Sequence, residues 1–92
     1  MTPAAAAEIG QSALIWLIGR PEALEAFLGA SGADAAEIRA RAGEPEFLGF
    51  VLEFLLQSED LTVDFARDAG LRPEAPARAR AALPGGDAPN WT

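Results

Sequence analysis

The chain contains no cysteine, no histidine and no tyrosine among its 92 residues. The missing cysteine excludes a disulfide framework and a thiolate metal site. The missing histidine removes the commonest general base and metal ligand, and the missing tyrosine removes the phenolic acid. We therefore expect no enzyme activity, no cofactor and no bound metal. Six hydroxyl residues remain as candidate nucleophiles, with no histidine to activate them: Thr2, Ser12, Ser31, Ser58, Thr62 and Thr92.

Lysine is absent as well, so all seven basic residues are arginines, and 14 acidic residues bring the net charge to −7. Such a chain repels nucleic acid and anionic membranes at long range. Residues 1–19 lack the basic leading region of a secretory signal, and no apolar run reaches the roughly 20 residues that span a bilayer. The composition predicts a cytoplasmic protein without membrane contact. Its expected partner is an unknown basic protein or, since half of the residues are apolar, a second copy of the chain.

The most apolar stretch, from Pro45 to Gln57, is predicted to be the central helix. It holds three of the five phenylalanines, and a helix that is apolar on nearly every side is surrounded by other helices. We therefore predict an all-α fold, a compact bundle of five or six short helices around this segment. One narrow polar stripe remains, at spacings of three and four residues: Glu46, Gly49, Glu53 and Gln57.

Start and stop signals define the other helices. A proline or a capping residue precedes each helix, and glycine follows most of them. Asp34 and Glu37 form a capping-box pattern, and Gly29 is a stop signal ahead of Gly32. The predicted helices are Thr2–Gly19, Pro21–Gly32, Asp34–Gly43, Ser58–Gly70 and a last one that starts near Pro73 or Pro76 and runs to Leu83.

Helical spacing assigns a buried face to three of these helices. In the second helix, the buried stripe consists of Leu24, Phe27 and Leu28. In the fifth helix, Leu61, Phe65 and Ala69 point inward. In the first helix, Ile15 falls on the opposite face and is predicted to be a single surface isoleucine. The buried face of the first helix consists of Ile9, Ala13, Leu14, Trp16, Leu17 and Ile18.

A chain of this length forms one domain, which we place at residues 1–84. Residues 85–92 are predicted to be a flexible C-terminal tail. Trp91 in this tail either folds back onto the domain or anchors a partner, since tryptophan is enriched at binding hot spots.

Residues 3–43 and 45–83 resemble each other weakly, at an offset of about 38 residues. A tandem pair of three-helix units predicts that the first and fourth helices lie together at the centre. Chance similarity between alanine-rich helices explains the same matches. The matched elements are Pro21–Leu24 with Ser58–Leu61, Phe27 with Phe65, Gly32 with Gly70, and Ile38–Ala42 with Ala77–Ala81.

A larger pattern resembles a small bacterial family, the domain of unknown function numbered thirty-five seventy-two. The resemblance covers roughly residues 12–85, and Pro76 departs from it because an aliphatic residue is expected there. The resemblance implies a compact, all-helical, stand-alone protein and no activity, and it carries over no functional residue. Its motifs are Pro21-Glu-x-Leu-x-x-Phe-Leu28, Ile38-Arg-Ala-Arg-Ala-Gly43, Phe47-Leu48, Val51-Leu-x-Phe-Leu-Leu56, Ala69-Gly-Leu71 and Ala77-Arg-Ala-Arg-Ala-Ala-Leu-Pro-Gly85.

Two helix–glycine–helix corners suggest a degenerate helix-turn-helix as an alternative function. A DNA reader needs basic side chains at the start of its second helix. The two starts instead hold Asp34 with Glu37, and Pro73 with Glu74, so nucleic acid is not the expected partner. A plain helical corner explains the same glycines. The residues that stand at helix-turn-helix spacing are Leu28, Gly32 and Ile38 in one corner and Ala66, Gly70 and Arg78 in the other.

Asp60, Asp64 and Asp68 stand four residues apart and form an acidic stripe on the fifth helix. Adjacent carboxylates on such a stripe are about 6 Å apart and solvated, whereas oxygen-ligand cation sites gather ligands from a loop or from several elements. We interpret the stripe as a solvated face or, together with Trp91, as a docking surface for a basic partner. The sequence therefore predicts a non-enzymatic protein-interaction or regulatory module.

Overall fold

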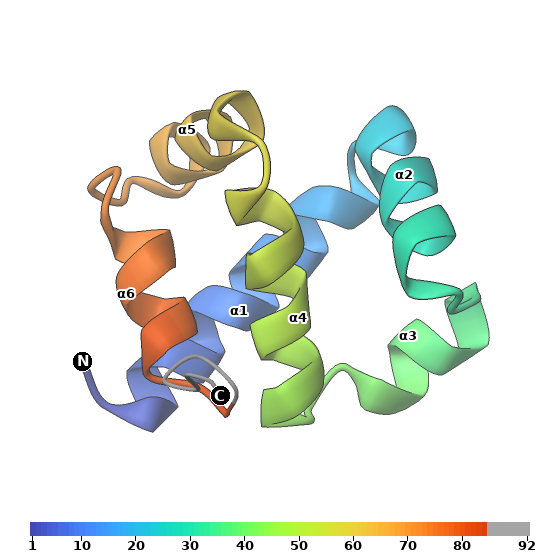
Figure 1. Cartoon of the computed structure of the whole chain (residues 1–92), viewed down its shortest axis with the longest axis horizontal. Coiled ribbons are helices and arrows are strands. Elements are labelled where there is room, and N and C mark those ends of the chain that lie inside the picture. Colours follow the sequence, from blue (N-terminus) through green and yellow to red (C-terminus); the bar gives the residue numbers. More distant parts are fainter. Residues whose placement is uncertain (85–92) are drawn as a thin grey trace, which may run out of the picture.

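The computed structural model describes residues 1–84, in which the chain forms six α-helices and no strand (Figure 1). The predicted all-α bundle is therefore confirmed, with a radius of gyration of 12.2 Å over its Cα atoms. No helix within residues 1–84 has the length and apolar character needed to cross a membrane. The helices are α1 (Pro3–Ile18), α2 (Pro21–Ser31), α3 (Ala35–Arg41), α4 (Pro45–Leu56), α5 (Glu59–Ala69) and α6 (Ala75–Ala81).

The predicted caps are present at most helix ends. The Thr2 and Ser58 hydroxyls accept hydrogen bonds from amides in the first turns of α1 and α5, and Asp34 with Glu37 forms the complete capping box of α3. Gly70 ends α5 in the left-handed conformation, with φ 71°. Gly32 ends α2 in the same way, and the predicted stop at Gly29 is wrong because that residue lies inside the helix.

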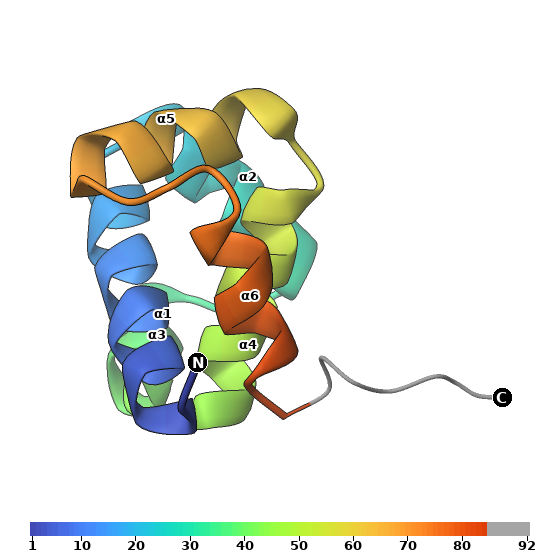
Figure 2. The ribbon, with the colours of Figure 1, turned by 90° about the vertical axis from the view of Figure 1, so that its left-hand side faces the viewer.

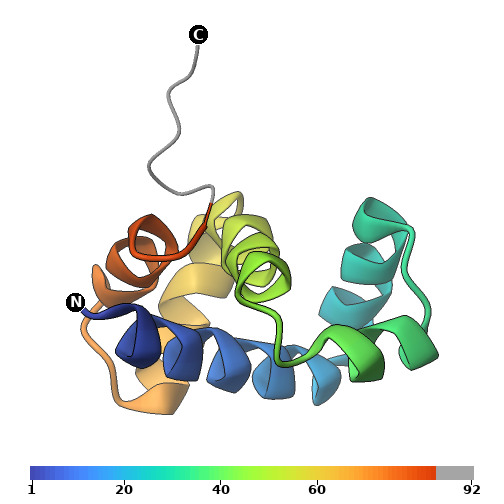
Figure 3. The ribbon, with the colours of Figure 1, turned by 90° about the horizontal axis from the view of Figure 1, so that it is seen from below.

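The centre of the fold is the crossing of α1 and α4, which lie against each other in Figures 1 and 3. Gly10 makes this close approach possible. A Cβ atom at Gly10 would lie 2.9 Å from the Leu48 Cβ, so any larger residue would push the helices apart. The expectation that the first and fourth helices share the centre is met.

Helix α6 lies against both α1 and α4 (Figure 2). Pro76 occupies the first turn of α6, where an amide hydrogen is not needed, and its ring is buried. The Arg80 side chain crosses Gly49, bonding Glu53 at 2.7 Å and the Pro84 carbonyl at 3.1 Å. Gly49, which was assigned to the polar stripe of α4, is buried as a result.

Aromatic side chains of α2 and α4 pack against each other. The ring centroid of Phe27, which is fully buried, lies 6.0 Å from that of Phe47, 5.6 Å from that of Phe50 and 5.3 Å from that of Phe54. Only Phe50 of this cluster is exposed, at 37%. The cluster places α2 on one side of α4, opposite α5 and α6 (Figure 1).

Two predicted faces need correction. Ile18 was assigned to the buried face of α1 but is 52% exposed, because the face that contacts α4 and α6 centres on Leu17 and Ala13. Ala69 was assigned to the inward face of α5 but is exposed, while Ala66 is buried in its place. Both errors are shifts of less than one helical turn.

The proposed duplication stays a prediction. Helices α2 and α5 have 11 residues each, α3 and α6 have seven each, and Gly32 and Gly70 share the same φ. The packing, however, is asymmetric. Helix α6 lies against both α1 and α4, whereas α3 makes no comparable contact with either helix.

Candidate functional site

The predicted acidic stripe lies on α5, but its three carboxylates have different surroundings. Asp64 pairs with Arg67 at 3.1 Å, and Asp68 is bonded to Trp16 of α1 and to Arg20, which precedes α2. Within residues 1–84, Asp60 makes no ion pair. The stripe is therefore not a uniform solvated face. Trp91, the other predicted docking residue, lies outside the described residues.

Asp68 belongs to a network that joins α5 to the end of α1. Its Oδ2 accepts hydrogen bonds from Trp16 Nε1 at 2.8 Å and from Arg20 Nη2 at 2.7 Å. The Arg20 guanidinium also lies over the Trp16 ring, 4.3 Å from its centroid. The hydrogen bonds from Trp16 and Arg20 hold the pKa of Asp68 below its usual value. This carboxylate has a structural role in the fold.

Four of the six candidate nucleophiles bond backbone groups, while Ser12 is exposed and Thr92 lies outside the described residues. Thr2 and Ser58 are helix caps, Ser31 accepts a hydrogen bond from the amide of Ala33, and the Thr62 hydroxyl donates to the Leu55 carbonyl at 2.7 Å. Within residues 1–84, no three acidic side chains come together in a group that could hold a metal ion.

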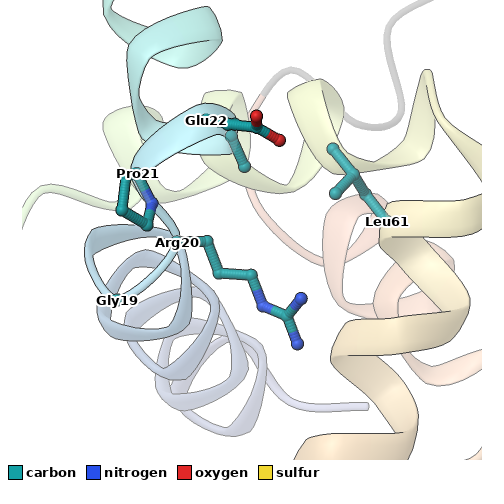
Figure 4. Close-up of a pocket in the computed structure, with 6 residues that line it drawn as sticks. Gly19, Arg20, Pro21, Glu22 and Leu61 are labelled. Carbon is teal, nitrogen blue, oxygen red and sulfur yellow. The ribbon is translucent and has the colours of Figure 1, made fainter.

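A hollow of about 770 Å³ opens between the α1–α2 corner and Leu61 of α5 (Figure 4). Arg20 and Glu22 supply its two charges, and Figure 4 shows Arg20 extending toward α5. Because the Arg20 guanidinium already bonds Asp68, its charge is committed to the fold. The hollow is therefore a weak candidate for an anion site.

A second hollow is apolar and lies between α1, α2 and α3. It has a volume of about 310 Å³, and eight of its nine lining residues are apolar. Leu14 and Ile38, which are 4% and 6% exposed, form its floor. We call it the α1–α2–α3 groove, and its lining residues are Leu14, Ile15, Ile18, Leu24, Leu28, Ala35, Ile38, Arg39 and Ala42.

Two large aliphatic side chains of α1 stand at this groove. Ile15 is 70% exposed and Ile18 is 52% exposed. Sequence reasoning treated Ile15 as a single surface residue and Ile18 as core, so it missed the pair. The signal was present, because Leu14 to Ile18 are five consecutive apolar residues and must cover every side of the helix. Some of them therefore face away from the core.

Arg39 is the single charged residue in the groove lining. Its side chain is exposed, and it belongs to none of the ion pairs within residues 1–84. By contrast, Arg41 on the same helix bonds Glu44 at 3.2 Å and lies over the Phe47 ring. The groove thus combines an apolar surface with one unpaired cation.

The residues of the helix-turn-helix alternative are placed unfavourably for reading DNA. Pro76 and Ala79 of α6 are buried against the core, and Arg80 is bonded to Glu53, which leaves Arg78 as the exposed arginine of that helix. Helix α3 is more exposed, but its first turn carries the acidic capping box. This alternative stays a prediction.

Comparison with known proteins gives a family and no function. Neither the curated proteins nor the solved structures contain a match to the chain. The family model described as "Protein of unknown function (DUF3572)" matches residues 3–86. This match covers most of the 92 residues and includes all six helices. The chain therefore belongs to the DUF3572 family, as the resemblance in its sequence implied.

Proposed function

We propose that the chain is a non-enzymatic protein-interaction module and that its partner docks in the α1–α2–α3 groove. The observation that carries this proposal is the exposure of Ile15 and Ile18 beside an apolar hollow of about 310 Å³. Single exposed aliphatic residues are ordinary, whereas contiguous apolar surface marks interaction sites. The cytoplasmic location expected from the sequence stays a prediction.

The roles of the polar residues support a binding module over a catalyst. The hydroxyls of Thr2, Ser58 and Thr62 bond backbone groups, and the Asp68 carboxylate holds α5 to α1. A catalyst would need side chains that are free to meet a substrate in a common site. The groove offers apolar contact area and one guanidinium, which suits recognition.

Site-specific photo-crosslinking in the native host tests the proposal. A benzophenone amino acid replaces Ile15 in one variant and Val63 in another. Val63 is the matched control, because it is also a large exposed aliphatic, at 44%, but lies on α5 outside the groove. We expect a defined cross-linked protein from position 15 and none from position 63. An Ile18→Gln substitution in the first variant should then weaken the cross-link.

The same experiment separates the groove from the acidic stripe. A third variant carries the cross-linker at Asp60, the stripe residue without an ion pair in residues 1–84. A partner captured from position 60 and not from position 15 would move the docking surface to α5 and contradict the groove. Identical products from all three positions would show non-specific association. That result would also contradict docking in the groove.

A further inference from the structure

The α3 wall of the α1–α2–α3 groove is about as long as two turns of an α-helix. This wall runs from Ala35 in α3 to Ala42 at the end of that helix. Seven steps at the helical rise of about 1.5 Å span about 10 Å. A helix presents apolar side chains at i, i+4 and i+7 over the same length. The length of this wall therefore matches a short amphipathic helix.

Backbone hydrogen bonding also favours a helix over an extended segment. The walls of the groove are helices, whose amide and carbonyl groups bond within each helix. An extended peptide in this apolar groove would leave the backbone groups that face the lining without partners. A helix satisfies those groups internally and buries only its apolar face.

Two other occupants fit the groove less well. Small-molecule sites enclose about 70–90% of the ligand surface, whereas this groove is open, with Ile15 70% and Ile18 52% exposed. A second copy would bring an identical concave face, and concave faces do not interdigitate. Each copy also carries a net charge of −7, which opposes close association of two copies.

Arg39 gives the groove a charge preference, because it is the single charged lining residue and has no ion pair within residues 1–84. We propose that the occupant is an amphipathic helix of a partner protein with an acidic residue beside its apolar anchors, positioned to meet Arg39. This inference rests on the proposed function and adds the chemistry of the partner to it.

Synthetic helical peptides test this inference on the full chain. Each peptide carries leucine at i, i+4 and i+7, and the two flanking positions i+3 and i+8 hold glutamate, glutamine or lysine. Binding is measured by fluorescence anisotropy at 0.15 M salt, where long-range attraction to the acidic protein is screened. We expect the glutamate peptide to bind about fivefold more tightly than the lysine peptide, as for one exposed ion pair.

Arg39→Glu should reverse this order. Arg41→Glu is the matched control, because it makes the same charge change on the same helix outside the groove. It should keep the wild-type order. Circular dichroism establishes that both variants are folded. The Ile15→Gln substitution should weaken the binding of all three peptides.

The outcomes separate the partner chemistry from the proposed function. All three peptides could bind with affinities that fall in Ile15→Gln but do not depend on Arg39. In that case the proposed acidic residue of the partner is wrong, while the groove remains a docking site. If no peptide binds, the helix is wrong as occupant, and the cross-linking experiment alone decides the function.

Saturable binding of decanoate that Arg39→Glu abolishes would assign the groove to a small amphiphile. A dimer in sedimentation velocity that Ile15→Gln dissociates would assign it to a second copy. Either result overturns the inference.

Discussion

The indole of Trp16 donates a hydrogen bond to Asp68 across 52 residues of sequence, with Nε1 2.8 Å from Oδ2. Arg20 bonds the same oxygen at 2.7 Å, so one carboxylate receives donors from α1 and from the α1–α2 corner. The Trp16 ring also meets the buried Phe65 of α5 edge to face, at 5.7 Å between centroids. This small cluster sets the position of α5 on α1.

The network makes stability depend on pH. Because the folded chain lowers the pKa of Asp68, the stabilisation is complete above the unfolded-state pKa, about 3.9, and disappears as pH falls through the folded-state value. The free energy of unfolding should therefore fall on acidification below about pH 4. Asp68→Asn should make this fall less steep. Urea denaturation between about pH 2 and 6 measures how the free energy of unfolding depends on pH. The Asp60→Asn variant is the control. Equal slopes for wild type and Asp68→Asn would contradict the assigned role.

Two glycine substitutions should have opposite effects, one at the α1–α4 crossing and one at an exposed position of α2. Gly10→Ala places a Cβ 2.9 Å from Leu48 and should lower the free energy of unfolding by about 1–3 kcal/mol. Gly29→Ala meets no atom within 4 Å inside α2 and should raise it by about 0.5–1 kcal/mol. Urea denaturation of both variants is the measurement. A stable Gly10→Ala variant would show that the two helices can separate without loss.

Phe27 is predicted to be the most sensitive aromatic residue. It is fully buried and meets three other phenylalanine rings, so Phe27→Ala should cost about 3–5 kcal/mol of unfolding free energy. Phe50→Ala is the control within the same cluster, and its 37% exposure predicts a clearly smaller loss. Thermal denaturation followed by circular dichroism compares them, and equal losses would be inconsistent with a core centred on Phe27.

The groove isoleucines should contribute little to stability. Ile15→Gln exposes no new surface at a site that is already 70% exposed, and glutamine is a good helix former. We expect its free energy of unfolding to stay within about 0.5 kcal/mol of wild type. Leu17→Gln, at 0% exposure on the same helix, should lose at least about 2–5 kcal/mol. A large loss for Ile15→Gln would mean that this residue belongs to the core.

Most helix bounds could be predicted because their signals are local. A capping residue such as Ser58 acts within three residues, and Gly70 ends a helix through its own backbone conformation. The pairing of α1 with α4 was also predictable, since these are the most apolar segments. Pro76 left the start of α6 ambiguous, because proline is tolerated at several positions of a first turn.

The features that escaped prediction depend on residues distant in sequence. The burial of Gly49 requires Arg80 to cross it from α6, and no local pattern indicates that arrangement. The role of Asp68 depends on Trp16 in the same way. The α1–α2–α3 groove exists only once three helices are placed around Leu14, so the exposure of Ile18 could not be assigned from spacing alone.

Helices α3 and α6 have equal length but are held very differently. Helix α6 has two buried residues and the Arg80 bonds, whereas Ile38 is the one buried residue of α3. An element with so few buried contacts opens at a free energy well below that of global unfolding. Helix α3 should therefore exchange its amide hydrogens earlier than α4. The α3 wall of the groove then opens more easily than the α1 wall, which would let the width of the groove adjust to the proposed partner helix.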